Sequence, residues 1–174
     1  PILALWGADF ADWVRSFAPA RSLPYLADMA RLERALCVAW HAADSRALST
    51  EALRTELADA GLLPGMRFDL HPSCAVLRSS YDVHALWIAH QREAAPAAID
   101  VEQACAVLIL RDAEDDVVAV RLDPPGAALI EALGAGCSLA EAVAAAPGCD
   151  VAAALAPLLR HGGIIACHRG AEVA

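Results

Sequence analysis

The stretch CAVLILRDAEDDVVAVRLD, residues 105–123, decides the fold because it predicts a β-hairpin. Its first part, CAVLILRD, begins with an apolar run, and VVAVRLD (117–123) begins with a second one rich in the β-branched residue valine. The acidic segment AEDD (113–116) between them has the composition of a turn. We therefore expect two antiparallel strands joined by a short acidic turn.

Three helices and a last strand are predicted after this hairpin. Each helix begins with a residue that can cap it: Asp123 followed by Pro124, Ser138 with Glu141 in the spacing of a capping box, and Asp150. The third helix is expected to run to His161 although Pro157 lies inside it, and IIACH (164–168) is expected to be a strand. The order strand, strand, helix, helix, helix, strand indicates a winged-helix-like domain over residues 99–174.

The first part of the chain, residues 1–98, is predicted to be a mainly helical domain, so the whole chain belongs to the α+β class. Apolar residues at helical spacing predict helices at 2–17 and 24–40. Ser49 or Thr50 can cap a third helix that ends just before Gly61, and 83–91 is expected to be a short helix. Residues 66–78 are ambiguous, because their alternation suggests a strand and Pro72 interrupts it. Residues 92–100 contain Pro96 and no apolar stripe, which is typical of a linker.

The charge of the chain argues against nucleic acid as a partner. It has 13 Arg, no Lys and 22 acidic residues, a net charge of −9. Residues 101–174 hold four Arg against ten acidic residues, a net charge of −6. The helix that would read DNA bases offers only Arg160 and His161, both at its far end. We therefore expect no duplex binding by this chain, no membrane span and a cytoplasmic protein.

Few residues have the pattern of a chemical site. Cys37 and His41 lie one helical turn apart and share a face, so they could supply two ligands to a metal ion. A structural zinc site needs four ligands, and His71 and Cys74 are the residues that could complete it. The chain contains no Gly-rich phosphate loop, HExxH or GxSxG motif. We therefore predict no catalytic residue, no cofactor and no metal, with a metal-binding enzyme as the remaining alternative.

Two stretches carry a resemblance to a known family. LPYLADMARLERALCVAWHAAD (23–44) is similar to the pattern LPYLxDxARLExAxxxAxHAxD, and LHPSCAVLRSSYDVHALWIAHQ (70–91) is similar to LHPSxxxLRSxYxVxxxW. These patterns are the paired signatures of the HvfC/BufC family of bacterial proteins. The resemblance covers essentially the whole chain, but the family's N-terminal helical domain, catalogued as a DNA-binding domain, is expected to be lacking here.

The resemblance implies a partner role without catalysis. Members of this family accompany TIM-barrel multinuclear iron oxidases, which modify cysteines in ribosomally made peptides. The expected function is therefore a non-enzymatic adaptor that binds a Cys-containing precursor peptide and the oxidase. The alternative is a transcriptional regulator that binds DNA through the missing N-terminal domain. A neighbouring oxidase gene and a short Cys-rich peptide gene would favour the adaptor.

Analogy with winged-helix-like modules of peptide-modifying systems predicts where the peptide binds. Such modules often take up a leader peptide as an added strand, so we expect pairing along 117–122 and contact with the third helix. The residues predicted to bind the peptide are Val118, Val120, Leu122, Leu155, Leu158 and Leu159. The polar residues predicted to serve a partner surface are Arg31, Glu33, His41, Asp44 and His71.

Overall fold

The computed structural model describes residues 7–91 and 98–169, which form an α+β fold as expected. The helices are α1 (Phe10–Ser16), α2 (Leu26–Trp40), α3 (Thr50–Glu56), α4 (Val83–His90), α5 (Pro124–Gly134), α6 (Leu139–Ala145) and α7 (Val151–Arg160). The strands are β1 (Met66–Leu70), β2 (Ala75–Ser79), β3 (Cys105–Arg111), β4 (Val117–Leu122) and β5 (Ile164–Arg169). Two short 3₁₀ helices, Ala18–Ala20 and Leu63–Gly65, complete these elements.

The predicted hairpin is confirmed. Strands β3 and β4 pair antiparallel, with Leu108 opposite Val120. The turn closes where the Asp112 N–H donates to the Asp116 carbonyl oxygen over 2.9 Å. Asp115 has a φ of 66°, a left-handed conformation that Asp adopts more readily than most non-glycine residues. The acidic segment thus forms a turn with one left-handed residue, a common way to close a hairpin.

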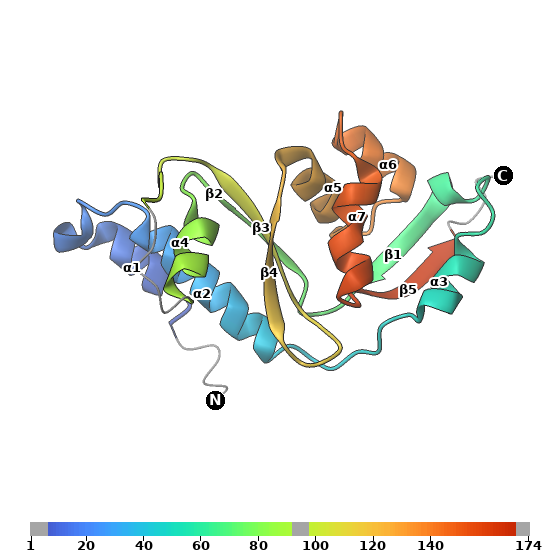
Figure 1. Cartoon of the computed structure of the whole chain (residues 1–174), viewed down its shortest axis with the longest axis horizontal. Helices are drawn as coiled ribbons and strands as arrows, with labels where there is room; N and C mark the ends of the chain where they lie inside the picture. Colours follow the sequence, from blue (N-terminus) through green and yellow to red (C-terminus); the bar gives the residue numbers. More distant parts are fainter. Residues whose placement is uncertain (1–6, 92–97, 170–174) are drawn as a thin grey trace.

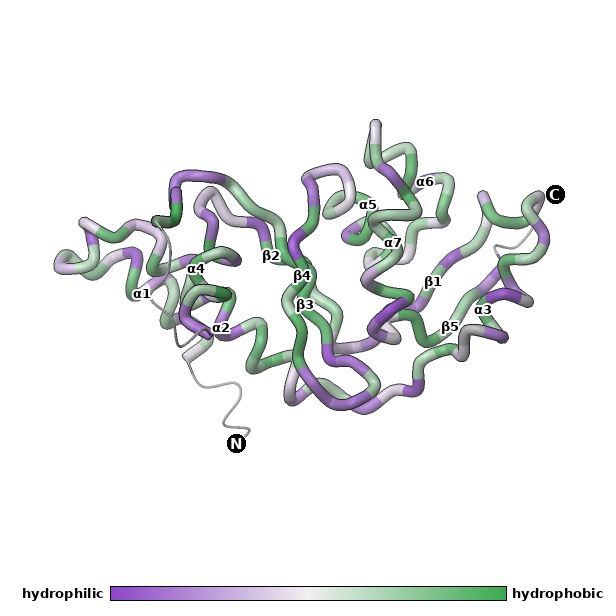
Figure 2. The backbone as a smooth tube through the Cα atoms, viewed as in Figure 1, coloured by the Kyte–Doolittle hydropathy of each residue, from purple (hydrophilic) through white to green (hydrophobic). Residues whose placement is uncertain are grey.

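Strand β3 is the centre of a three-stranded antiparallel sheet in the order β2-β3-β4, and every residue of it except Arg111 is buried. Because successive side chains of a strand point to opposite faces, β3 contributes to two cores. Leu108 and Leu110 join the larger core, with α5, α6, α7 and β1. Val107 and Ile109 join the smaller core, with α2 and α4. The sheet therefore forms a layer between two groups of helices (Figure 1), and its central strand is apolar up to Arg111 at its end (Figure 2).

Strand pairing crosses the domain boundary that the sequence predicts near residue 98. Strand β2 pairs with β3, and β1 pairs antiparallel with β5, with Phe68 opposite Cys167. The ambiguous segment 66–78 thus supplies two strands, and Pro72 lies in the turn between them. The last strand does not join the hairpin, because it forms a separate two-stranded sheet with β1. The order of elements in 105–169 is the expected one, but strands on both sides of residue 98 share sheets.

The predicted helix starts are confirmed after the hairpin. Ser138 and Glu141 make both hydrogen bonds of the capping box, and the side chains of Asp123 and Asp150 accept from backbone N–H groups in their first turns. Helix α7 continues through Pro157 up to Arg160. In the first half, α1 begins only at Phe10, and residues 1–6 of the helix predicted at 2–17 lie outside the described residues. Residues 92–97 of the predicted linker also lie outside them.

In the described ranges, 7–91 and 98–169, every helix is too short or too polar to cross a membrane.

Replacing Leu108 tests the central position of β3. Leu108 is fully buried, and Leu108→Ala should lower the free energy of unfolding by about 2–5 kcal/mol, because it removes buried methyl groups and leaves a cavity. The measurement is denaturant unfolding followed by circular dichroism. The matched control is Leu62→Ala, whose side chain is 38% exposed and should cost about 0.5 kcal/mol or less. Equal losses in both variants would contradict the burial of Leu108 in the larger core.

Candidate functional site

The turn of the hairpin determines which backbone groups of β4 face away from the sheet. Asp112 and Asp116 are a hydrogen-bonded pair, and bonded and non-bonded pairs alternate along an antiparallel ladder. Val118 and Val120 therefore bond to β3. The residues whose N–H and C=O groups face outward are Val117, Ala119 and Arg121. Because no described strand lies beyond β4, these groups form an open edge.

One outward group of β4 is already occupied. His84 Nε2 lies 3.2 Å from the Ala119 carbonyl oxygen. A carbonyl oxygen only accepts, so Nε2 carries the proton and donates. Within the described part of the chain, the other outward groups of Val117, Ala119 and Arg121 have no hydrogen-bond partner. The contact with His84 also agrees with the outward direction that the alternation gives to Ala119.

The opposite edge of the sheet, on β2, is shorter. The same alternation leaves only Val76 and Arg78 of β2 facing outward. Arg31 Nη1 donates to the Arg78 carbonyl oxygen over 3.3 Å. Just before the strand, the Cys74 N–H donates to the His71 carbonyl oxygen over 2.8 Å. Strand β4 is therefore the more open edge.

Helix α7 and β4 share the larger core. The side chains of Val118, Val120 and Leu122 pack into that core, and Leu155 of α7 packs against it. Leu159 on the same helix is 46% exposed, so it is open to contact with a ligand. Leu158 is fully buried and lies near Gly163, so it holds α7 in place and has no surface for a peptide. Of the peptide-binding residues predicted from the sequence, Leu159 is therefore a surface position, and the others lie in or against the larger core.

An ion pair ties the start of α4 to the end of β4. Arg121 Nη1 lies 2.7 and 2.6 Å from the two carboxylate oxygens of Asp82. The hydrogen bond to Asp82 raises the pKa of Arg121 further above its usual value, so the guanidinium stays charged. Asp82 also caps α4 by accepting from the Ala85 N–H. This pair places α4 beside the outward residues of β4.

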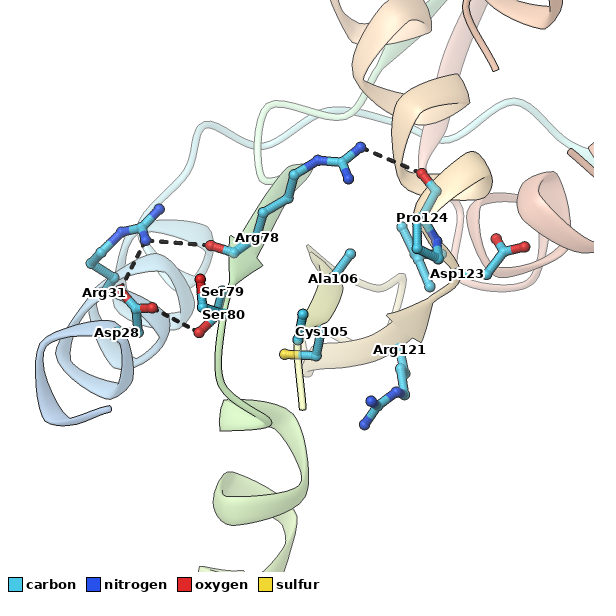
Figure 3. Close-up of a pocket in the computed structure, with 12 residues that line it drawn as sticks. Asp28, Arg31, Arg78, Ser79, Ser80, Cys105, Ala106, Arg121, Asp123 and Pro124 are labelled. Atoms are coloured by element: carbon cyan, nitrogen blue, oxygen red, sulfur yellow. Dashed lines mark hydrogen bonds and ion pairs between the residues drawn. The ribbon is translucent and has the colours of Figure 1, made fainter. Parts of the chain in front are cut away.

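A pocket of about 580 Å³ opens where β2 and β4 end and β3 begins (Figure 3). Three guanidinium groups line it, and each is paired with a carboxylate: Arg31 with Asp28 at 3.0 Å, Arg78 with Glu131 at 2.9 Å and Arg121 with Asp82 at 2.6 Å. The positive charges are thus balanced within the protein. The pairs of Arg78 and Arg121 connect α5 and the start of α4 to the ends of strands, whereas the pair of Arg31 lies within α2. Helix α2 is joined to β2 by the hydrogen bond from Arg31 to the Arg78 carbonyl oxygen, so all three arginines have a structural role.

Four of the five residues predicted for a partner surface are exposed. Arg31 and Glu33 lie on α2, His41 follows its last residue, and Asp44 lies in the next loop. Asp44 accepts a hydrogen bond from Arg111 Nη2 at 2.7 Å, so it anchors this loop to the end of β3. His41 and Asp44 lie at the end of α2 and in the loop that follows it, whereas Arg31 and Glu33 lie along the helix. Helix α2 packs on the side of the sheet opposite α5.

The fifth residue, His71, is buried and therefore cannot meet a partner directly. Its Nδ1 accepts from the Ser73 hydroxyl at 2.7 Å, and Ser73 Oγ in turn accepts from the Arg111 N–H. Burial, followed by the charge of Arg111, lowers the pKa of His71, so the imidazole is neutral near pH 7. His71 thus joins the turn after β1 to the end of β3.

Cys37 and His41 cap the end of α2. His41 Nδ1 donates to the Cys37 carbonyl oxygen over 2.9 Å, and the Cys37 sulfur lies 3.9 Å from the same nitrogen. In residues 7–91 and 98–169, no group of three or more His, Cys, Asp or Glu side chains could hold a metal ion. The shared face of Cys37 and His41 is explained by helix capping.

Comparison with known proteins adds no family assignment. The chain matches no protein-family model, and no curated protein matches it. The pairing expected along 117–122 includes the outward residues, but Val117, Ala119 and Arg121 are not among the residues predicted to bind the peptide. The contact from His84 was not predicted either.

Proline substitutions test the direction of the β4 backbone. Val120→Pro removes a donor that bonds to β3 and leaves a buried carbonyl unpaired, whereas Ala119→Pro removes an outward N–H. We expect Val120→Pro to cost about 1–3 kcal/mol more in unfolding free energy than Ala119→Pro. Thermal and denaturant unfolding of the two variants measure this difference. A greater loss in Ala119→Pro would reverse the assignment of inward and outward residues.

The cysteines should differ strongly in reactivity. Burial raises the pKa of Cys74 and of Cys167 to about 11, whereas Cys37 is exposed. The raised pKa keeps these two thiols protonated, so at about pH 8 they should react with iodoacetamide about 100-fold more slowly than an ordinary thiol. Mass spectrometry of timed reactions should find Cys37 labelled first. Denaturant should equalise the rates, and rapid labelling of Cys74 in the folded chain would disprove its protected state.

Proposed function

We propose that this chain is a non-enzymatic peptide-binding adaptor that takes up an extended peptide as an added strand on β4. The observation that carries this proposal is the outward edge of Val117, Ala119 and Arg121, on which only the Ala119 carbonyl is occupied among the described residues. An open edge offers main-chain donors and acceptors at the spacing that an extended peptide needs. The edge of β2 is shorter, which favours β4 as the binding strand.

We propose that α7 supplies an apolar wall on one side of the added strand. A peptide strand beside β4 directs alternate side chains toward α7, where Leu159 is exposed and Leu155 is partly buried. Main-chain pairing then supplies affinity, and contacts with these leucines supply selectivity. The helices α5–α7 serve the groove in the way a winged-helix-like module does, with α7 as the helix that meets the ligand.

We further propose that the peptide is a Cys-containing ribosomal precursor and that the second partner is a TIM-barrel multinuclear iron oxidase. The sequence signatures at 23–44 and 70–91 support membership of the HvfC/BufC family. The exposed polar residues Arg31, Glu33, His41 and Asp44 offer a surface for the oxidase in a cytoplasmic complex. The net charge of −9 supports a protein partner over DNA.

Co-expression tests the adaptor role. The chain is expressed with the oxidase and the short Cys-containing peptide encoded next to it, and each component is tagged in turn. The proposal expects all three to purify together, with iron only on the oxidase. Failure of the peptide and the oxidase to bind the chain in either tagging direction, or the lack of such neighbouring genes, would refute the proposal.

A charge on the apolar wall should weaken peptide binding. Leu159→Asp places an uncompensated carboxylate against an apolar ligand surface, and we expect at least a tenfold loss of affinity by calorimetry. The matched control is Val143→Asp on α6, which is 39% exposed and lies outside the groove. It should bind as the parent does, once circular dichroism shows that both variants are folded. An unchanged affinity for Leu159→Asp would contradict the proposed contact between the peptide and α7.

A further inference from the structure

His84 lies where the central residue of an added strand would pair. Ala119 is the middle one of the three outward residues of β4, and its carbonyl oxygen accepts from His84 Nε2 at 3.2 Å. An added antiparallel strand needs that same acceptor for one of its own N–H groups. A peptide and His84 therefore compete for one oxygen atom.

The position of His84 is determined by its neighbours in the chain. Asp82 is bound by Arg121 of β4, and its side chain caps α4. Val83 is fully buried in the smaller core. Two consecutive residues are thus anchored immediately before His84. The fold therefore holds the backbone of His84 beside the edge, and its imidazole lies within hydrogen-bond distance of the Ala119 carbonyl oxygen.

We propose that His84 is an intramolecular competitor that occupies the β4 edge until a peptide displaces it. This inference rests on the proposed function, because it concerns the same edge. It assigns His84 a role in setting the affinity, because only a ligand that donates a main-chain N–H to the Ala119 carbonyl oxygen replaces the lost hydrogen bond. It also gives the free protein a covered acceptor at the point where a second copy could pair through β4.

The test uses a peptide selected from a random library of short peptides against the parent chain. A suitable probe is one whose binding is abolished by Ala119→Pro, since that variant loses the outward N–H and places a ring on the edge. Its affinity is then measured by calorimetry for the parent, His84→Ala and His84→Leu. The leucine variant removes the donor and retains side-chain volume. The matched control is His90→Ala on the same helix, whose ring bonds within α4 to the Leu86 carbonyl oxygen.

We expect both His84 variants to bind the probe about three- to tenfold more tightly than the parent, as the loss of one competing hydrogen bond requires. His90→Ala should bind as the parent does. Equal or weaker binding by the folded His84 variants, while the parent still binds at β4, would overturn the competitor role alone. If selection against the parent and against His84→Ala yields no peptide whose binding depends on β4, the proposed function is overturned. This inference is then overturned with it.

Discussion

Burial of β3 on both faces is the constraint on which the rest of the structure depends. A strand with apolar side chains on both sides must be covered by two layers. Helices α2 and α4 provide one layer, and α5–α7 with β1 provide the other. Strand β2 occupies one side of β3 and β4 the other, so each outer strand keeps one unpaired edge. The open edge of β4 thus follows from its place as an outer strand of a three-stranded sheet.

Ion pairs at the ends of the strands position the covering helices. The pairs of Arg78 with Glu131 and of Arg121 with Asp82 connect a strand end to α5 and to the start of α4. Partly exposed pairs of this kind contribute only about 0–1 kcal/mol each to the stability of the fold. Their main effect is to position the helices relative to the strands. The pair at Arg121 matters most for the site, because it brings α4 near β4 and His84 within reach of the Ala119 carbonyl.

Local signals in the sequence were sufficient for the hairpin and for the helices that follow it. Asp123, Ser138 and Asp150 begin their helices as capping rules predict. The partner of β5 could not be predicted, because β1 was ambiguous in sequence and pairing between distant segments depends on packing. The outward residues of β4 were also missed, because the turn, with the left-handed Asp115, determines which alternate residues bond to β3. Val118 and Val120 were predicted to pair with the peptide, yet their backbone groups bond to β3 and their side chains pack against the larger core.

The composition of β4 favours an edge that pairs with another segment. Exposed edges are usually protected by Lys, Pro or a bulge, and VVAVRL contains only one charge, at Arg121, which is paired with Asp82. His84 then protects this edge through a single hydrogen bond to the Ala119 carbonyl oxygen, which an incoming main chain can replace. Since any extended peptide can make the main-chain bonds, the proposed selectivity must come from side chains beside them. Leu159 is the large apolar side chain that α7 exposes, so the proposed choice of ligand depends most on what it contacts there.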